Sequence, residues 1–147
     1  MPIFERRGAI HISTEADNFI VIFKDTIQAV TAAIEMQNVL KAYTASLPRN
    51  NVDKSKDKYH FRVRLNGIGI HCGKGVVIDK QDKMHGEVYN VAYHIGEDLC
   101  EDGNVMISRE AMNRVKDAPY FKGNIRYEPT EDDADIFCLK GKLPQAA

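Results

Sequence analysis

The stretch "AIHISTEADNFIVIFKDTIQAVTAAIEMQNVL", residues 9–40, decides the fold class. Its first half is apolar on both sides of a short polar break from Thr14 to Asn18, a pattern typical of a β-hairpin over 9–23. Its second half starts at Asp25, a residue type favoured at helix N-caps, and then repeats apolar residues at helical spacing. The segment therefore predicts a hairpin followed directly by a helix near 25–45.

The next part of the chain predicts a loop and two further strands. Residues 46–58 are polar and charged without a period, which is typical of an exposed loop. The stretch that follows, "YHFRVRLNGIGIHCGKGVVID", places Phe61, Val63 and Leu65 on one face before a glycine-rich section. We expect two strands here with a tight bend that the glycines permit.

The C-terminal third completes a mixed α+β pattern. It predicts a helix near 87–101, a short strand "NVMIS" whose Ser108 caps a last short helix, and a closing hairpin made of "NIRYEP" and "DIFCLKG". The expected order is ββαββαβαββ, with helices on one face of a mixed, mostly antiparallel sheet. Residues 1–147 are long enough for a single domain with its own core.

Composition excludes several classes of protein. Twenty basic and twenty-one acidic residues give a formal charge of −1, and no basic cluster follows one element, so we expect no nucleic-acid partner. Cys72, Cys100 and Cys138 are far apart in the sequence, which argues against a zinc knuckle or a disulfide framework and favours a reducing compartment. No apolar run is long enough for a membrane span. We therefore expect a cytoplasmic protein without direct membrane insertion.

Two polar residues on the helix near 87–101 are the first candidates for a site. Asn90 and His94 are four residues apart, so they lie on the same helix face. They are either part of an active site or polar residues on a face that packs against a partner subunit. A nucleophilic pair of His71 and Cys72 is not expected, because adjacent residues on a strand point to opposite faces. The acidic run "EDDAD" at 131–135 is typical of a solvated turn.

Three segments together resemble the class III nucleotidyl cyclases, which make cyclic AMP or cyclic GMP. "HISTEADNFIVIFKDTIQAVTAAIEMQNVL" resembles the family's hairpin and Ala-rich helix, and "RVRLNGIGIHCGKGVV" resembles its glycine-isoleucine-histidine strand. "HGEVYNVAYHIGEDLCEDGNVMIS" is similar to its helix with Asn-x-x-Ala and the strand after it. Order and spacing agree over residues 8–112. The resemblance implies a ferredoxin-like cyclase fold that is incomplete at its N-terminus, lacking the family's first strand and the two helices after it.

The resemblance also implies which residues would bind metal. The family holds two metal ions, Mg²⁺ or Mn²⁺, with two aspartates on neighbouring strands. Asp17 matches one of them, and its alternative role is that of an ordinary turn residue. The other aspartate belongs to the first strand and has no counterpart here. We expect no cofactor unless the protein is active.

The remaining family positions differ from the active pattern. The base-recognition positions correspond to Ser13 and Lys83, and neither residue preserves the adenine pattern, although Asp82 would fit if the turn slipped by one residue. Asn90 matches the asparagine that orients the ribose. His94 occupies the place of the arginine that stabilises the phosphate, and histidine cannot offer the same bidentate fork.

These differences predict a cyclase homology domain without activity that serves for dimerisation or assembly in a larger complex. Its partner would be another cyclase-like chain or an assembly subunit. Two alternatives stay open. The chain is a working half of an adenylyl or guanylyl cyclase that takes ATP or GTP and whose first metal aspartate lies outside this sequence, or it is a small-ligand sensor that uses Asp17 and Asn90 in the old nucleotide cleft.

Overall fold

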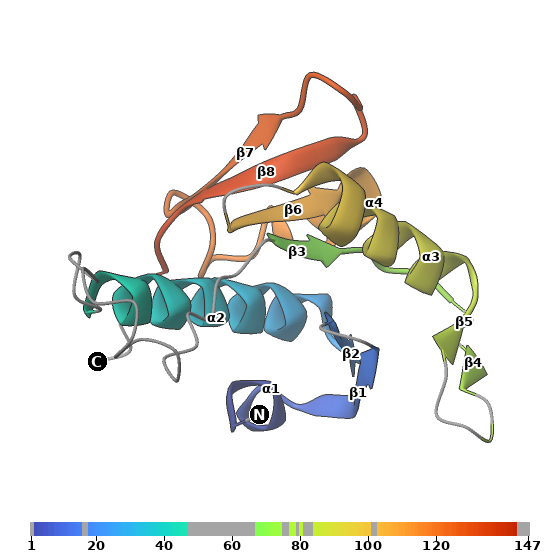
Figure 1. Cartoon of the computed structure of the whole chain (residues 1–147). Helices are drawn as coiled ribbons and strands as arrows, with labels where there is room; N and C mark the ends of the chain where they lie inside the picture. The colour runs from blue at the N-terminus through green and yellow to red at the C-terminus, as the bar shows by residue number, and fades with distance from the viewer. Residues whose placement is uncertain are drawn as a thin grey trace, which may run out of the picture.

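The computed structural model describes residues 2–15, 18–46, 67–74, 77–78, 80, 84–100 and 103–143. Figure 1 shows the elements. In chain order they are helix α1 (Pro2–Arg6), strands β1 (Ala9–Glu15) and β2 (Asn18–Phe23), helix α2 (Thr26–Ser46), strands β3 (Gly67–Ile70), β4 (Val77–Ile78) and β5 (Met84–His85), helix α3 (Glu87–His94), the π-helix η2 (Ile95–Leu99), strand β6 (Asn104–Ser108), helix α4 (Arg109–Val115), and strands β7 (Ile125–Pro129) and β8 (Ile136–Gly141).

The predicted hairpin and the helix after it are confirmed. β1 and β2 pair antiparallel from Glu15 opposite Asn18 to Ala9 opposite Phe23, with a bulge near Ile10. The carboxylate of Asp25 accepts a hydrogen bond from the Ile27 N–H at 2.9 Å, which satisfies one of the donors left free at the start of α2. The hairpin and the start of the helix thus have the local structure that the sequence predicts.

α2 has two buried sides because it packs against two separate groups of strands. Val30, Ala33 and Ile34 belong to the main core. Ala32 and Met36 pack instead against α1 and the hairpin, in the second cluster that also includes Val21 and Phe23 of β2. A helix buried on two sides needs no sharp division into one apolar and one polar face.

The larger sheet has four strands in the order β3-β6-β8-β7. β3 and β6 are parallel, whereas β6 with β8 and β8 with β7 are antiparallel. The predicted mixed, mostly antiparallel sheet is therefore confirmed. Among the described residues, the hairpin forms a sheet of its own, and so do β4 and β5.

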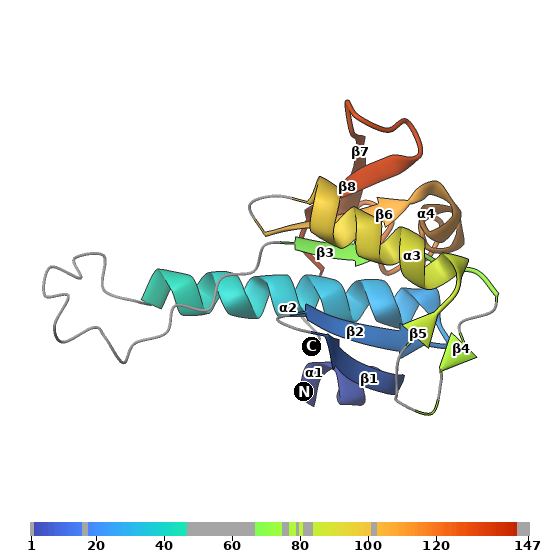
Figure 2. The ribbon, with the colours of Figure 1, turned by 45° about the vertical axis from the view of Figure 1, so that its right-hand side comes forward.

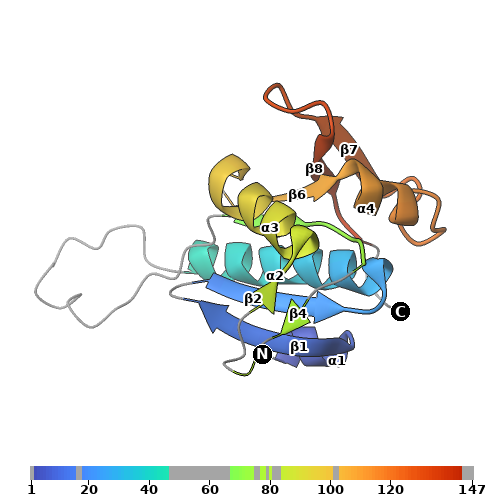
Figure 3. The same cartoon turned by 90° about the vertical axis from the view of Figure 1, so that its right-hand side faces the viewer.

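The prediction that the helices share one face of the sheet is wrong. Val105 and Ile107 of β6 pack with α2 and α4 in the main core. Met106, between them, packs with Ile95 of η2 in another cluster. Because neighbouring residues of a strand point to opposite faces, α2 and α4 cover one face and α3 with η2 covers the other. Figure 3 shows α2 and α3 on opposite sides of the sheet.

The glycine-rich stretch differs in part from its prediction. β3 is a strand as expected, but β4 pairs with β5 and not with β3, so the two strands do not form one bent ladder. Phe61, Val63 and Leu65 lie outside the described residues, and so does the expected loop at 46–58 apart from Ser46, the last residue of α2.

α1 was not predicted. Its Phe4 is buried against Ala32 and Met36 of α2 and meets the Phe23 ring edge-on, with ring centroids 6.4 Å apart. Arg6 and Arg7 both pair with the Glu35 carboxylate of α2. Burial by itself would raise the pKa of Glu35, but the hydrogen bonds from Arg7 and Arg6 lower it below its usual value. α1 therefore covers part of α2 that the hairpin leaves free.

No helix within the described ranges is both long and apolar enough to cross a membrane.

Candidate functional site

The helix that carries Asn90 and His94 packs on the sheet through every fourth residue. Ile95 is fully buried, and Val91 and Leu99 pack beside it against Met106 and other residues of the second sheet face. Asn90 and His94 precede Val91 and Ile95 by one position, which turns them about 100° around the helix from the packed residues, and both are exposed. The structure therefore places this pair on one open helix face, as its spacing predicts.

The helix lies very close to β3 because Gly69 of β3 packs against Gly96 of the helix and neither has a side chain. A Cβ atom placed on Gly69 would lie 2.4 Å from the backbone oxygen of Ala92 and from the backbone nitrogen of Gly96. The predicted helix near 87–101 changes at Ile95 from an α-helix to a π-helix and ends at Leu99, with the Cys100 N–H bonded to the Ile95 carbonyl at 3.0 Å. π-Helical turns of this kind are rare and occur often at functional sites.

His94 is paired with a carboxylate. Its Nδ1 lies 2.7 Å from Oδ2 of Asp98, one turn further along, and both side chains are more than half exposed. The two residues are four positions apart in the sequence, a spacing that allows this contact, but the sequence analysis did not predict the pairing. Residues 84–100 contain Glu87, Glu97 and Asp98 and neither lysine nor arginine. This face therefore has the charge sign that disfavours a polyphosphate.

A second contact joins this helix to the hairpin. Asn18, the first residue of β2, donates a hydrogen bond from Nδ2 to Oε1 of Glu97 at 2.7 Å. Ser13 lies on the hairpin opposite Ile20, half-buried, on the face away from Ile12 and Val21. Within the part of the chain that the structure describes, no hydrogen bond connects Ser13 with Asn90 or His94.

Two of the predicted site residues lie outside the described ranges. Asp17, the metal position, and Lys83, a base-recognition position, have no described placement, and the same holds for Asp82. Among the residues that are described, no three His, Cys, Asp or Glu side chains are arranged to hold a metal ion. Metal binding at Asp17 and the use of Mg²⁺ or Mn²⁺ stay predictions.

A contact between His71 and Ser108 was also missed. Nδ1 of His71 at the end of β3 lies 2.7 Å from Oγ of Ser108 at the end of β6. Ser108 is almost fully buried and caps α4 by accepting a hydrogen bond from the Ala111 N–H at 3.2 Å, as the sequence predicts. Because β3 and β6 are parallel neighbours, their ends meet, although the two residues are far apart in sequence. A buried serine with two partners is suited to structure and not to nucleophilic attack.

Ser108→Ala should lower the free energy of unfolding by about 1–2 kcal/mol, because it removes the helix cap and leaves His71 without its partner. Urea unfolding of the two proteins measures the difference. Ser13→Ala is the matched control and should change the stability by less than about 0.5 kcal/mol, since Ser13 lies half-buried at a strand position without a capping role. Equal losses in the two variants would contradict the role given to Ser108.

All three cysteines are free thiols, and burial weakens each of them as an acid. Burial raises the pKa of Cys100 to about 11, and its Sγ contacts the Ile68 carbonyl oxygen at 3.4 Å. Burial likewise raises the pKa of Cys72 and of Cys138. Thiols with raised pKa values stay protonated at neutral pH, so they are poor nucleophiles.

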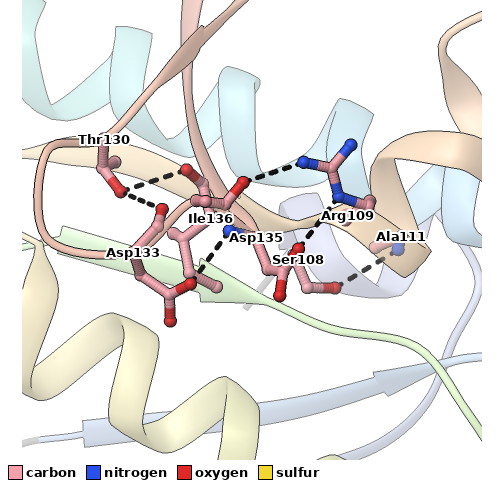
Figure 4. Close-up of polar contacts among 8 residues, drawn as sticks. Ser108, Arg109, Ala111, Thr130, Asp133, Asp135 and Ile136 are labelled. Atoms are coloured by element: carbon pink, nitrogen blue, oxygen red, sulfur yellow. Dashed lines mark hydrogen bonds and ion pairs between the residues drawn. The ribbon is translucent and has the colours of Figure 1, made fainter.

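The acidic run at 131–135 is a turn, as predicted, and four of its five residues are exposed. Asp133 accepts the N–H of Asp135 at 2.9 Å, and Thr130 donates to the Asp133 carbonyl oxygen at 2.7 Å. Arg109 at the start of α4 binds the Asp135 carboxylate at 3.0 Å and the Ala134 carbonyl oxygen at 2.9 Å. Figure 4 shows these contacts side by side. The carboxylates of Asp133 and Asp135 are engaged in holding the turn against the helix.

Comparisons with known proteins support the fold. A scan against protein-family models finds no match, and a search of curated proteins finds none. Among solved structures, an adenylate/guanylate cyclase/hydrolase from Silicibacter pomeroyi is similar, with a TM-score of 0.65 and 18% sequence identity over 99% of this chain and 78% of that one. This chain therefore has a fold like that of a nucleotidyl cyclase.

Proposed function

We propose that this protein is a cyclase-like domain without catalytic activity that serves as an assembly module in a larger complex. The observation that carries the proposal is the pairing of His94 with Asp98 at 2.7 Å. At the position where the resemblance places a phosphate-binding arginine, the chain has a shorter side chain that a carboxylate already holds. Loss of one such charge donor typically costs on the order of 10²-fold or more in rate.

The isolated protein should form no cyclic nucleotide above background when it is incubated with ATP or GTP and Mn²⁺. A single metal carboxylate, Asp17, is not enough to hold two metal ions. An acidic helix face does not stabilise the negative charge that develops on the phosphate. Chromatographic detection of cyclic AMP and cyclic GMP after long incubation measures this. His94→Arg should also stay inactive, because the second metal carboxylate would still be missing.

Turnover that disappears in Asp17→Ala would contradict the proposal and favour the alternative. In that alternative, the chain is a working half of an adenylyl or guanylyl cyclase and another polypeptide segment supplies the first metal aspartate. The exposed Asn90 favours it, because this side chain is open to a ligand. Active enzyme would need Mg²⁺ or Mn²⁺, and ATP or GTP would be the substrate.

Association should involve the exposed face of α3. The aromatic rings of Tyr89 and Tyr93 on this helix lie 5.8 Å apart, and Tyr93 is 39% exposed, which gives the face an apolar part beside Asn90 and His94. Such a mixture of aromatic and polar groups is common at protein interfaces. The partner would be a second cyclase-like chain or another subunit of the complex.

We expect the purified protein to have the mass of a dimer or larger assembly at micromolar concentration, and Asn90→Glu, which adds a further negative charge to the acidic face, to shift it to the monomer. A charge at the centre of an interface is costly when it meets no opposite charge. Light scattering coupled to size exclusion gives the mass. Asn113→Glu, at an exposed position of α4, is the matched control and should leave the mass unchanged. A monomer at all concentrations would contradict the assembly role.

A further inference from the structure

Three sulfur-bearing side chains lie between η2 and the larger sheet. Met106 and Cys138 are buried in the cluster around Ile95, and Cys100, the residue after η2, packs against the same cluster. Cys72 belongs to the main core instead. Figure 2 shows the helix formed by α3 and η2 lying over β3 and β6, and both strands contact η2. The sulfur cluster, defined by Cys100, Met106 and Cys138, has no part in the function proposed above.

Strand pairing places Cys138 beside Met106. The two residues are partners in the antiparallel ladder of β6 and β8. Side chains of directly opposed residues leave the sheet on the same face, with Cβ atoms about 4.5–5.5 Å apart. The thiol of Cys138 and the thioether of Met106 therefore start from adjacent points on the sheet face that η2 covers.

The Cys100 thiol approaches Met106 from the other side. Its Sγ lies 3.4 Å from the carbonyl oxygen of Ile68 on β3 and is also hydrogen-bonded to the backbone of Met106 on β6. β3 and β8 are the two neighbours of β6, so Cys100 and Cys138 flank Met106. The two thiols are near enough to interact electrostatically.

The absence of a side chain at Gly67 allows the Cys100 thiol to reach the sheet. A Cβ atom placed on Gly67 would lie 3.0 Å from Sγ of Cys100 and closer still to its Cβ. Any other residue at position 67 would push the thiol away from β3 and β6. Cys100 is only half-buried, so the sulfur cluster is open to solvent on this side.

Charged side chains around Cys138 act on its thiol. Burial raises the pKa of Cys138, and Glu128, its ladder partner on β7, adds to this effect. Lys140, which is hydrogen-bonded to the thiol, and Lys41 of α2 lower the pKa. Two cations are thus in place to offset negative charge if the thiol loses its proton.

The donor set restricts the choice of metal. Thiolates and thioethers are soft ligands that select Cu(I), zinc or iron–sulfur clusters. Structural zinc sites almost always have four ligands, and iron–sulfur clusters are held by four cysteines or by cysteines with histidines. Among the described residues, no third His, Cys, Asp or Glu joins Cys100 and Cys138 in a metal-binding group. Two thiols and one thioether therefore fit Cu(I) best.

The strand spacing suits two sulfur ligands on one ion. A metal–sulfur bond is about 2.3 Å long, so two sulfurs on one ion lie at most about 4.6 Å apart. Neighbouring strands are about 4.8 Å apart, so thiols on either side of β6 reach this separation when their side chains turn toward Met106.

We infer that Cys100, Met106 and Cys138 form a binding site for one Cu(I) ion, held by the two thiolates with the thioether as third donor. Two S–H bonds break and two Cu–S bonds form, and two protons leave to solvent. The oxidation states of copper and sulfur do not change. The bound site carries one negative charge, which Lys140 offsets. This inference is independent of the assembly role proposed above.

The affinity for Cu(I) should rise steeply with pH. Burial raises the pKa of Cys100 to about 11 and raises that of Cys138, so both thiols are protonated in the free protein near neutral pH. Because binding releases both protons, the dissociation constant should fall by about 100-fold for each pH unit between roughly pH 7 and 8.

The test is competition for Cu(I) between the whole chain and the chromophoric chelator bicinchoninate in oxygen-free buffer. The protein should withdraw about one equivalent of Cu(I). Cys100→Ser and Cys138→Ser should each weaken binding at least about 100-fold, since even the loss of an outer partner of a metal ligand costs about 10–100-fold. Each should also reduce the pH dependence to about tenfold per unit, because one thiol remains.

Two further variants complete the comparison. Cys72→Ser is the matched control and should bind Cu(I) like the unaltered protein, since Cys72 lies in the main core. Met106→Leu keeps the side-chain volume and removes only the thioether, so it should weaken binding by about tenfold without loss of folding. Urea unfolding of each variant confirms that the protein is folded where Cu(I) binding is measured.

Three results would overturn the inference. The first is a folded protein that withdraws no Cu(I) at pH 8. The second is a tenfold pH dependence in the unaltered protein, which would mean that a single thiol holds the ion. The third is a loss of affinity in Cys72→Ser as large as that in Cys100→Ser or Cys138→Ser, which would mean that Cu(I) binds to cysteines without a defined site.

Discussion

Gly69→Ala is expected to lower the free energy of unfolding by about 3 kcal/mol or more. The new Cβ would lie 2.4 Å from the Ala92 oxygen and from the Gly96 nitrogen, and both are backbone atoms that cannot rotate away. Insertion of atoms into a tightly packed contact typically costs about 1–3 kcal/mol and more where the backbone must move. The helix that carries Asn90 and His94 would have to lift from β3, so the association proposed for this helix should be lost as well. Urea unfolding and the mass in solution check the two effects.

Gly96→Ala is the matched control because it places a methyl group in the same contact from the other side. Here the nearest atoms are the Gly69 nitrogen at 3.2 Å and its Cα at 3.7 Å, which is tight but tolerable. Alanine also favours a helix over glycine by about 1 kcal/mol. We expect a change of less than about 1 kcal/mol. If both variants lose similar stability, the close approach between β3 and η2 is not the cause.

Phe121→Ala should destabilise the protein by about 3–5 kcal/mol, the usual cost of removing a buried phenylalanine ring. Phe121 is fully buried in the main core, in the turn that connects α4 to β7. The backbone of this residue also accepts the Ile125 N–H at 2.9 Å at the start of β7, so the surrounding chain is held and cannot close over the cavity. A large fraction of the stability of a domain of this size would be lost.

The same substitution at Phe19 separates burial from residue type. Phe19 is 54% exposed on the hairpin, so Phe19→Ala should cost less than about 1 kcal/mol. Thermal and urea unfolding of the two variants, measured in parallel, give the comparison. A loss at Phe19 as large as the loss at Phe121 would show that the hairpin is packed more deeply than the structure indicates.

Local signals in the sequence were sufficient for most of the elements. The alternation around the polar break gave the hairpin, and Asp25 marked the start of α2 because its side chain accepts the Ile27 N–H. Ser108 was predicted as a cap for the same reason. Each of these features depends on interactions between residues only a few positions apart, as helix caps and turns do.

Sheet faces and long-range contacts could not be predicted in the same way. Apolar spacing shows that Ile34 and Ile95 are buried, but it does not show which sheet face each one meets. That depends on the alternation of Val105, Met106 and Ile107 at the centre of the sheet. The bond between His71 and Ser108 is likewise invisible until β3 and β6 are known to be parallel neighbours.

The candidate site could be placed in part. The spacing of Asn90 and His94 predicted their common exposed face, and the structure has them there. Their partners depend on the three-dimensional arrangement, since the Asn18 contact to Glu97 joins segments 79 positions apart. Asp17 and Lys83 stay predictions from resemblance, because they lie outside the described residues.

The separation of the hairpin from the four-stranded sheet also has a consequence for how the protein unfolds. Within the described residues, β1, β2 and α1 share no strand pairing with the larger sheet. They pack mainly on Ala32 and Met36, whereas the larger sheet keeps its own core around Ile107 and Phe137. Cooperative units with few ties to the rest of a protein open at a lower free energy than the whole. The hairpin and α1 should therefore detach first on heating, so that a protease cuts near Gly8 and Lys24 while the remainder is still folded. A partner that covers this region should raise the temperature of the first unfolding step and leave the temperature of the last step unchanged.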